Sequence, residues 1–440
     1  MPLLRDLLSD KDQCRQQAAN VLASTFGVAP AAEVVSIYVP GRVEFLGKHT
    51  DYAGGRTVVL AVDRGFRLVA AARKDKQVRI ADAAGTDVRQ FEYGQTPAHA
   101  PGDWVNYCAT VARRLSMNFG GVTDLKGVDM AFVSDLPPAA GMSSSSALIV
   151  TTFLGIVAVN RLDQAPLYRA HIHDKLELAA YAACNENGQT YGQLTGEKGV
   201  GTFGGSEDHT AMLCCKEGML SQFSYAPSVF ERDLPWPAGY ELVIGCSGVE
   251  AVKTGSAMAQ YNRASIRARK AADAFNRATG SSFRLLRQIA LHVGKSGLGE
   301  AKAGIAQGVL PEDKGEDLPG RFEQFFLEDQ EIIPALGDDL LAGRLDRLDA
   351  LVDRSHKLAD MGLQNQVPQT NFLQQQARKL GALASSYFGA GFGGSVWAMV
   401  EKGKTSPFIE AWKQAYTRQF PRQAGRCEFF TTRPGRPASW

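Results

Sequence analysis

The segment DLPPAAGMSSSSALIV (135–150) joins a strand-like stretch to an apolar helix through a turn of proline and glycine. One serine suffices to cap a helix, yet four follow one another at Ser143–Ser146. The free N–H groups and hydroxyls at the start of a buried helix form a ready anion site. The segment therefore predicts a strand–loop–helix unit that binds phosphate, with simple helix capping as the alternative. No Walker G-x-x-x-x-G-K-[ST] sequence is present, so a nucleotide site here needs another architecture.

Two further glycine-rich segments carry polar chemistry. GRVEFLGKHTDYAGG (41–55) follows a β-branched stretch, and its ionisable side chains either bind a polar ligand or belong to a solvated connection. GTFGGSEDHTAML (201–213) places Glu207, Asp208 and His209 directly after two glycines. This second segment predicts either a carboxylate held at a site by a rigid turn or an aspartate that caps a helix.

Composition and charge narrow the class of protein. The chain has 45% hydrophobic and 21% charged residues and a net charge of +2, which is typical of a globular protein with no global field for nucleic acid or membrane. Neither is expected as a partner. The cysteines are scattered and odd in number, which favours a reducing cytoplasm over a disulfide framework. The longest apolar run, 147–159, is too short to span a bilayer. We expect a cytoplasmic protein, with an amphipathic N-terminal helix instead of a signal peptide.

The order of the expected elements indicates an α+β fold. Strand signals dominate the first half, helical spacing dominates about 254–383, and a strand signal returns in GFGGSVWAMVEKG (391–403). Prolines in DLPWPAGY (233–240) mark a probable boundary. The sequence thus predicts an N-terminal domain over 1–233 and a C-terminal domain over 234–440.

Three segments together resemble the three motifs of the GHMP sugar and metabolite kinases. They are PGRVEFLGKHTDYAGG (40–55), LPPAAGMSSSSA (136–147) and GAGFGG (389–394), in this order along the chain. The first is similar to the galactokinase signature P-G-R-V-N-L-I-G-E-H-T-D-Y-N-G-G.

Shorter segments between these motifs extend the resemblance over roughly 37–400. WVNYCATV (104–111) is similar to the family's W-A-N-Y, and CNENGQTYG (184–192) to its A-E-N-x-F. GGSEDH (204–209) stands where the family has C-G-I-M-D-Q, and AQYNRASIRARKAADA (259–274) resembles the S-x-Y-x-x-R-R helix start.

The resemblance implies a two-domain GHMP kinase fold with the active site in the cleft between mixed-sheet halves. It implies transfer of the ATP γ-phosphoryl group to the anomeric hydroxyl of a sugar, with galactose as the first expectation, and a monomer or weak oligomer. Asp208 would accept or orient the hydroxyl proton, and Arg42 would stabilise charge on the transferring group.

The remaining implied roles concern the ligands. The sugar would be bound by Lys48, His49, Asp51, Gly205 and Tyr261. ATP would be held by Trp104, Gly141, Ser143, Ser144, Ser145 and Ser146, and Mg²⁺ by Ser145 and Glu186.

The sequence departs from the family at two places that bear on the site. Lys48 stands where galactokinases carry glutamate. It either pairs with Glu44 or another local acid, donates to a sugar hydroxyl, or faces a substrate carboxylate. About ten extra residues, GQLTGEKGVG (192–201), precede Asp208 and make Glu197 a second candidate for the metal ligand.

These departures leave two alternative functions. One is a kinase for another sugar, such as a uronic acid selected by Lys48. The other is a non-catalytic, galactokinase-like sugar sensor that regulates a protein partner, although Asp208, Arg42 and the four serines are all present.

Overall fold

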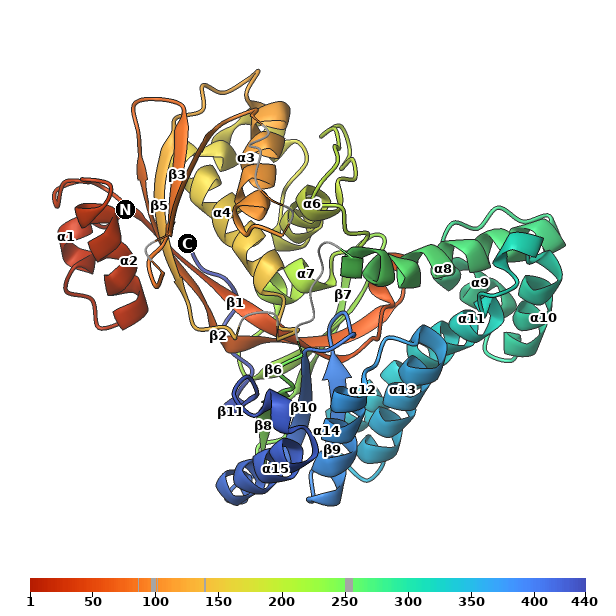
Figure 1. The fold of residues 1–440 in the computed structure, drawn as a ribbon. Helices are drawn as coiled ribbons and strands as arrows, with labels where there is room; N and C mark the ends of the chain where they lie inside the picture. The colour runs from red at the N-terminus through yellow and green to blue at the C-terminus, as the bar shows by residue number, and fades with distance from the viewer. Residues whose placement is uncertain (86, 96–99, 101, 138–139, 250–255) are drawn as a thin grey trace.

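The computed structural model describes residues 1–440 except 86, 96–99, 101, 138–139 and 250–255 (Figure 1). Two residues of the expected phosphate loop, Pro138 and Ala139, thus lie outside the described part. Within that part, no helix combines the length and apolarity that a membrane span requires.

A seven-stranded mixed sheet forms the first half of the molecule. Its order is β4-β3-β5-β2-β6-β7, with β1 also paired to β2; β3 and β5 are parallel and the other pairs are antiparallel. The strands are β1 (Val35–Leu46), β2 (Arg56–Ala72), β3 (Gln77–Asp82), β4 (Asp87–Glu92), β5 (Val128–Ser134), β6 (Met219–Ser224) and β7 (Val229–Pro235).

Register shifts in the β1–β2 pair lie on either side of two site residues. They fall between Pro40 and Arg42 and between Glu44 and Leu46. Irregularities of this kind re-aim side chains and are frequent beside active sites. They place the polar Arg42 and Glu44 in a strand that is otherwise apolar and almost wholly buried.

Helices cover both faces of this sheet (Figure 1). The short α1 (Leu4–Leu7) and α2 (Gln13–Ser24) lie on one side, where α2 packs on β2 and β5. On the other side lie α3 (Val105–Phe119), α4 (Ser144–Asn160), α5 (Pro166–Arg169), α6 (Lys175–Asn187) and α7 (Glu207–Cys214). Helix α4 packs on β1 and β2 and is apolar on all sides, so it is buried as the sequence predicts.

The second half contains a four-stranded antiparallel sheet in the order β11-β8-β10-β9. Its strands are β8 (Tyr240–Cys246), β9 (Ala384–Phe388), β10 (Ser395–Glu401) and β11 (Glu428–Thr432). The helices that pack against it are α13 (Leu348–Leu363), α14 (Pro368–Lys379) and α15 (Thr405–Gln419).

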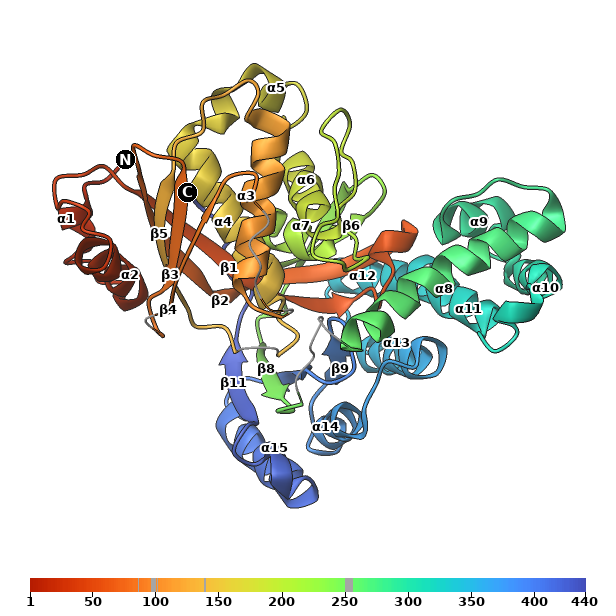
Figure 2. The same ribbon diagram turned by 45° about the horizontal axis from the view of Figure 1, so that its top comes forward.

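A helical cluster extends from this half. It is formed by α8 (Ser256–Thr279), α9 (Leu286–Val293), α10 (Leu298–Gly308) and α11 (Leu318–Leu327), and a π-helical turn (Glu328–Ile332) leads on to α12 (Ile333–Leu341). Both views show the cluster beside the tip of the β1–β2 hairpin, where Ala53 packs into its core (Figure 2).

The α+β class is confirmed, and the two sheets separate much as the strand order predicts. The proposed boundary at 233/234 falls inside β7, which stays paired to β6 through Pro235, so we propose that the division lies in the connection 236–239. The end of the chain returns to the first sheet, where Ser439 pairs with Tyr38 and Pro434 with Val62.

Candidate active site

The three segments that resemble the kinase motifs, 40–55, 136–147 and 389–394, converge in the structure although they lie far apart in the sequence. Arg42 N donates to Met142 O at 3.3 Å, which joins the first segment to the phosphate loop. Ser395 Oγ donates to Ala140 O at 2.6 Å, which joins the phosphate loop to the strand after the third segment. His49 Nε2 lies 3.1 Å from Ala390 O.

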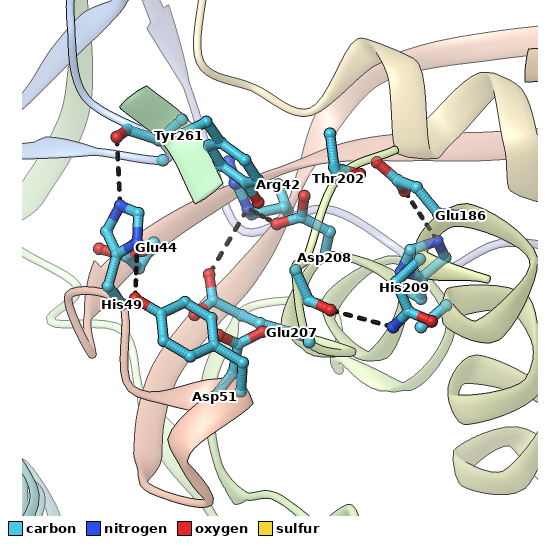
Figure 3. Close-up of a pocket in the computed structure, with 17 residues that line it drawn as sticks. Arg42, Glu44, His49, Asp51, Glu186, Thr202, Glu207, Asp208, His209 and Tyr261 are labelled. Atoms are coloured by element: carbon cyan, nitrogen blue, oxygen red, sulfur yellow. Dashed lines mark hydrogen bonds and ion pairs between the residues drawn. The ribbon is translucent and has the colours of Figure 1, made fainter. Parts of the chain in front are cut away.

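A solvent-open pocket with an empty volume of about 510 Å³ lies at this junction, and residues from both halves line it (Figure 3). The residues that line it include Arg42, Glu44, His49, Asp51, Glu186, Thr202, Gly204, Gly205, Glu207, Asp208, His209 and Tyr261.

Arg42 and Asp208 form the central ion pair. Arg42 Nε lies 2.7 Å from Asp208 Oδ1, and Nη1 donates to Gly141 O at 2.5 Å. Burial alone lowers the pKa of this arginine, but the charges of Asp208 and Glu207 outweigh it and raise the pKa above its ordinary value. The guanidinium is therefore permanently charged although its side chain is only 3% exposed.

The four serines divide into two pairs. Ser143 adopts φ +54° before α4, and its hydroxyl donates to Asp208 Oδ2 at 2.5 Å. Ser146 Oγ lies 3.2 Å from the same oxygen and donates to Glu186 Oε2 at 2.7 Å. Ser144 and Ser145 are half-buried in the first turn of α4, with no side-chain hydrogen bond within the described part of the chain.

The two carboxylates predicted as candidate metal ligands lie in different places. Glu186 accepts a hydrogen bond from Ser146, which follows the predicted Ser145, and the metal role of Ser145 and Glu186 stays a prediction. The second candidate, Glu197, forms an ion pair with Arg113 and does not line the pocket, because the extra segment carries it away from the phosphate loop.

The predicted sugar residues His49, Asp51, Gly205 and Tyr261 all line the pocket. His49 adopts φ +56°, and its Nδ1 lies 3.1 Å from the Tyr52 hydroxyl. A Cβ atom at Gly205 would overlap the Asp51 carboxylate, so only glycine permits this approach. Burial raises the pKa of Asp51 to about 6, and the charges of Asp208 and Glu44 add to this effect.

Lys48 does not line the pocket in which its contact with the sugar was predicted. Its ammonium is fully buried beneath the loop, 2.8 Å from Glu44 Oε1 and 2.7 Å from Tyr387 O. The first of the three alternatives, pairing with Glu44, therefore describes its position. A lysine whose donors are already occupied inside the protein offers no cation to a substrate.

The backbone of the same loop is held from the second half of the molecule. Glu328 accepts from Gly47 N at 2.8 Å and from Lys48 N at 3.3 Å, and Gln324 donates to Lys48 O at 3.0 Å. These contacts orient the loop and leave His49 and Asp51 to face the pocket.

Trp104 lies away from this pocket. Its indole N–H donates to Asp87 at 3.0 Å, and its ring packs edge-on against Phe132. Its role beside adenine stays a prediction.

Four further residues line the pocket although the sequence predicts no ligand role for them: Glu44, Thr202, Glu207 and His209. The signal for Glu207 was present, because it directly precedes Asp208 where the family motif carries methionine. Glu44 likewise stands where the galactokinase signature carries asparagine.

Two family models and several curated proteins match this chain. The galactokinase galactose-binding signature matches residues 22–73, and the N-terminal domain of the GHMP kinases matches residues 106–193. A galactokinase from Roseiflexus sp. (strain RS-1) is 29% identical over 396 residues, which cover 89% of each chain. A galactokinase from Thermococcus kodakarensis is 25% identical over 410 residues, which cover 90% of this chain and 97% of the relative.

Solved structures share the fold. The galactokinase of Lactococcus lactis, complexed with galactose, superposes with a TM-score of 0.74 at 22% identity and covers 96% of this chain and 98% of its own. The mevalonate kinase of Methanococcus jannaschii superposes with a TM-score of 0.53 at 13% identity and covers 92% of this chain and 99% of its own. The chain thus carries the galactose-binding signature of the galactokinases and matches the N-terminal domain of the GHMP kinases.

Proposed function

We propose that this chain is an ATP-dependent sugar kinase that transfers the γ-phosphoryl group to the anomeric hydroxyl of galactose or a close relative. The products are a sugar 1-phosphate and ADP. The galactose-binding signature and the galactokinases that align over about nine-tenths of the chain support this activity. The observation that carries it is the Asp208–Arg42 pair beside the serine-rich start of α4.

Asp208 is the group that we assign to the acceptor hydroxyl. The sugar oxygen forms a bond to the γ-phosphorus, the bond to the β–γ bridging oxygen breaks, and the hydroxyl proton passes to the carboxylate. Arg42, 2.7 Å from Asp208, places a permanent positive charge where negative charge collects on the transferring group.

The nucleotide phosphates fit the start of α4. The first N–H groups of an α-helix have no hydrogen-bond partner within the helix. Together with the hydroxyls of Ser144 and Ser145, they suit an anion. Gly141, with φ +76°, lets the backbone turn closely past the strand of the second half. Trp104 remains our candidate for the adenine side.

Ser146 and Glu186 fit a magnesium ion. A hydroxyl 2.7 Å from a buried carboxylate supplies the hard oxygen donors that Mg²⁺ prefers. When bound, the ion would supply positive charge that neutralises the phosphates. We therefore assign Ser146 the role predicted for Ser145.

The two alternative functions are less well supported. A uronic acid would bring a carboxylate into a pocket lined by acidic side chains, and Lys48 is not there to receive it. A non-catalytic sensor has no need of the base and phosphate loop, and both are retained here.

We further propose that the enzyme works in the cytoplasm as a monomer or weak oligomer. All seven cysteines are free thiols, which suits a reducing compartment. Light scattering during gel filtration measures the oligomeric state.

The test is phosphorylation of galactose by the purified chain, followed by ADP release and by ³¹P NMR of the product. We expect a sugar 1-phosphate that forms only with ATP and a divalent cation. A product phosphorylated elsewhere, or no turnover with any hexose, would contradict the proposal.

A further inference from the structure

Among the described residues, Glu207 is the pocket carboxylate that has neither a hydrogen bond nor a short ion pair. Its side chain is 5% exposed and lines the pocket. Its one ion pair is a long one, 3.7 Å from Glu207 Oε1 to Arg42 Nε, and that nitrogen already lies 2.7 Å from Asp208. A buried carboxylate normally accepts several short hydrogen bonds, so Glu207 lacks donors on the side that faces the pocket.

The other carboxylates of the pocket have short contacts within the protein. Asp208 accepts from Ser143 and Arg42, Glu186 accepts from Ser146, and Glu44 pairs with Lys48 at 2.8 Å. Asp51 accepts from the backbone N–H of Glu207 at 3.3 Å.

The described part of the pocket lining is rich in acid, with one guanidinium, Arg42, and five carboxylates: Glu44, Asp51, Glu186, Glu207 and Asp208. Glu44 is paired with Lys48, Asp208 with Arg42, and Glu186 is the carboxylate that we assign to the magnesium ion. Within the described residues, Asp51 and Glu207 are left without a short contact to a cation, which favours a substrate with a positive charge on this side of the pocket.

We propose that Glu207 is a specificity-determining residue that makes the kinase prefer a hexose with a protonated amino group at carbon 2. This inference rests on the proposed sugar 1-kinase activity. An ammonium offers three donors and a full positive charge to a carboxylate that lacks both.

Glu207 lies close to the group that we assign to the anomeric hydroxyl. Glu207 and Asp208 are adjacent in the chain, and each places an oxygen within 4 Å of Arg42 Nε. An amino group next to the anomeric carbon, at carbon 2, is therefore the one that we propose and test.

The protonation of Glu207 offers a second way to test the proposal. Burial raises the pKa of Glu207 well above its ordinary range; Glu44, Asp51 and Asp208 raise it further and Arg42 opposes them. The other ionisable groups around it are Tyr225, His209 and, behind Glu44, Lys48. Binding of an ammonium favours the ionised carboxylate, so binding of the amino sugar should release a proton, whereas binding of galactose should not.

The experiment compares kcat/KM for 2-amino-2-deoxygalactose and galactose in the unmodified enzyme, in Glu207→Gln and in Glu207→Met. We expect the unmodified enzyme to prefer the amino sugar, and both variants to lower the ratio by about ten- to a hundredfold, the range expected for a hydrogen bond between charged groups. Glu401→Gln, at an exposed glutamate paired with Lys404, is the matched control and should leave the ratio unchanged.

Calorimetry in two buffers of different ionisation enthalpy tests the same inference without a variant, by counting protons released on binding of each sugar to the unmodified enzyme. An enzyme that phosphorylates galactose, shows no preference for the amino sugar and releases no proton overturns this inference alone. An enzyme that phosphorylates neither sugar overturns the proposed function as well.

Discussion

The pocket has two walls, the loop after β1 and the turn before α7, and their charged side chains are paired differently. In the loop after β1, the charge of Lys48 is met by Glu44, and the backbone of the loop is held by Glu328 and Gln324. In the turn before α7, the side chain of Glu207 has no hydrogen bond within the described part of the chain, and Asp208 is held by Arg42 and Ser143. In the first wall Lys48 and Glu44 neutralise each other, whereas in the second wall the Glu207 carboxylate faces the pocket with only a long ion pair to Arg42.

This contrast shows that a charged residue in a binding motif does not by itself contact the ligand. Whether it does depends on whether the protein already supplies its partner. Lys48 has that partner in Glu44, four residues earlier in the chain. The most conspicuous departure from the family motif is therefore the residue least available to a substrate.

The largest effect is expected from a substitution in the second wall, at Asp208. Asp208→Asn removes the proton acceptor but keeps the shape, so we expect kcat to fall by about 10²- to 10⁴-fold. Binding of a fluorescent ATP analogue should change little. Asp346→Asn, at an exposed position, is the control, and retained turnover in Asp208→Asn would show that another group takes the proton.

A substitution in the first wall, at Lys48, should affect the stability of the fold instead of the phosphoryl transfer. Lys48→Met leaves Glu44 as a buried, unpaired charge, so we expect the free energy of unfolding to fall by about 3–5 kcal/mol. Urea denaturation measures it. Lys404→Met removes an exposed partner of Glu401 and is the control, which should leave the urea midpoint unchanged. If the Lys48→Met protein had normal stability and an altered sugar preference, the result would show that Lys48 contacts the substrate.

The point where the two walls meet is sensitive to a single methyl group. Gly205→Ala would push a Cβ atom into the Asp51 carboxylate and the Tyr52 backbone. Overpacking of this kind costs about 1–3 kcal/mol, so we expect KM for the sugar to rise by about ten- to a hundredfold. Gly239→Ala, where a Cβ atom would meet nothing within 4 Å, is the control; equal effects of the two changes would argue against the close contact.

The smallest effect is on the pH profile. Burial raises the pKa of Asp51 to about 6, so this carboxylate gains a proton as pH falls through 6 instead of near 4. If the ionised form binds the sugar, kcat/KM should decline about tenfold per pH unit below that value. Asp51→Asn should remove this limb of the profile, and an identical limb in the variant would assign it to another group.

Much of the fold could be predicted because its signals are local. The apolar run after the four serines indicated the buried helix α4, and the β-branched stretches before and after Lys48 indicated β1 and β2. The boundary was harder to predict, because Pro235 can end an edge strand as easily as precede one, and β7 continues to that residue.

The sequence by itself determined which chemical groups are present and in what order: an arginine, a serine-rich helix start and a carboxylate after two glycines. Only the tertiary structure decided which of them meet the substrate. Register shifts along β1 and contacts across the two halves of the molecule turn Lys48 inward, bring Glu186 to Ser146 and leave Glu207 facing the pocket. These outcomes depend on partners up to several hundred residues away, such as Tyr387 O beside Lys48, and no local pattern records them.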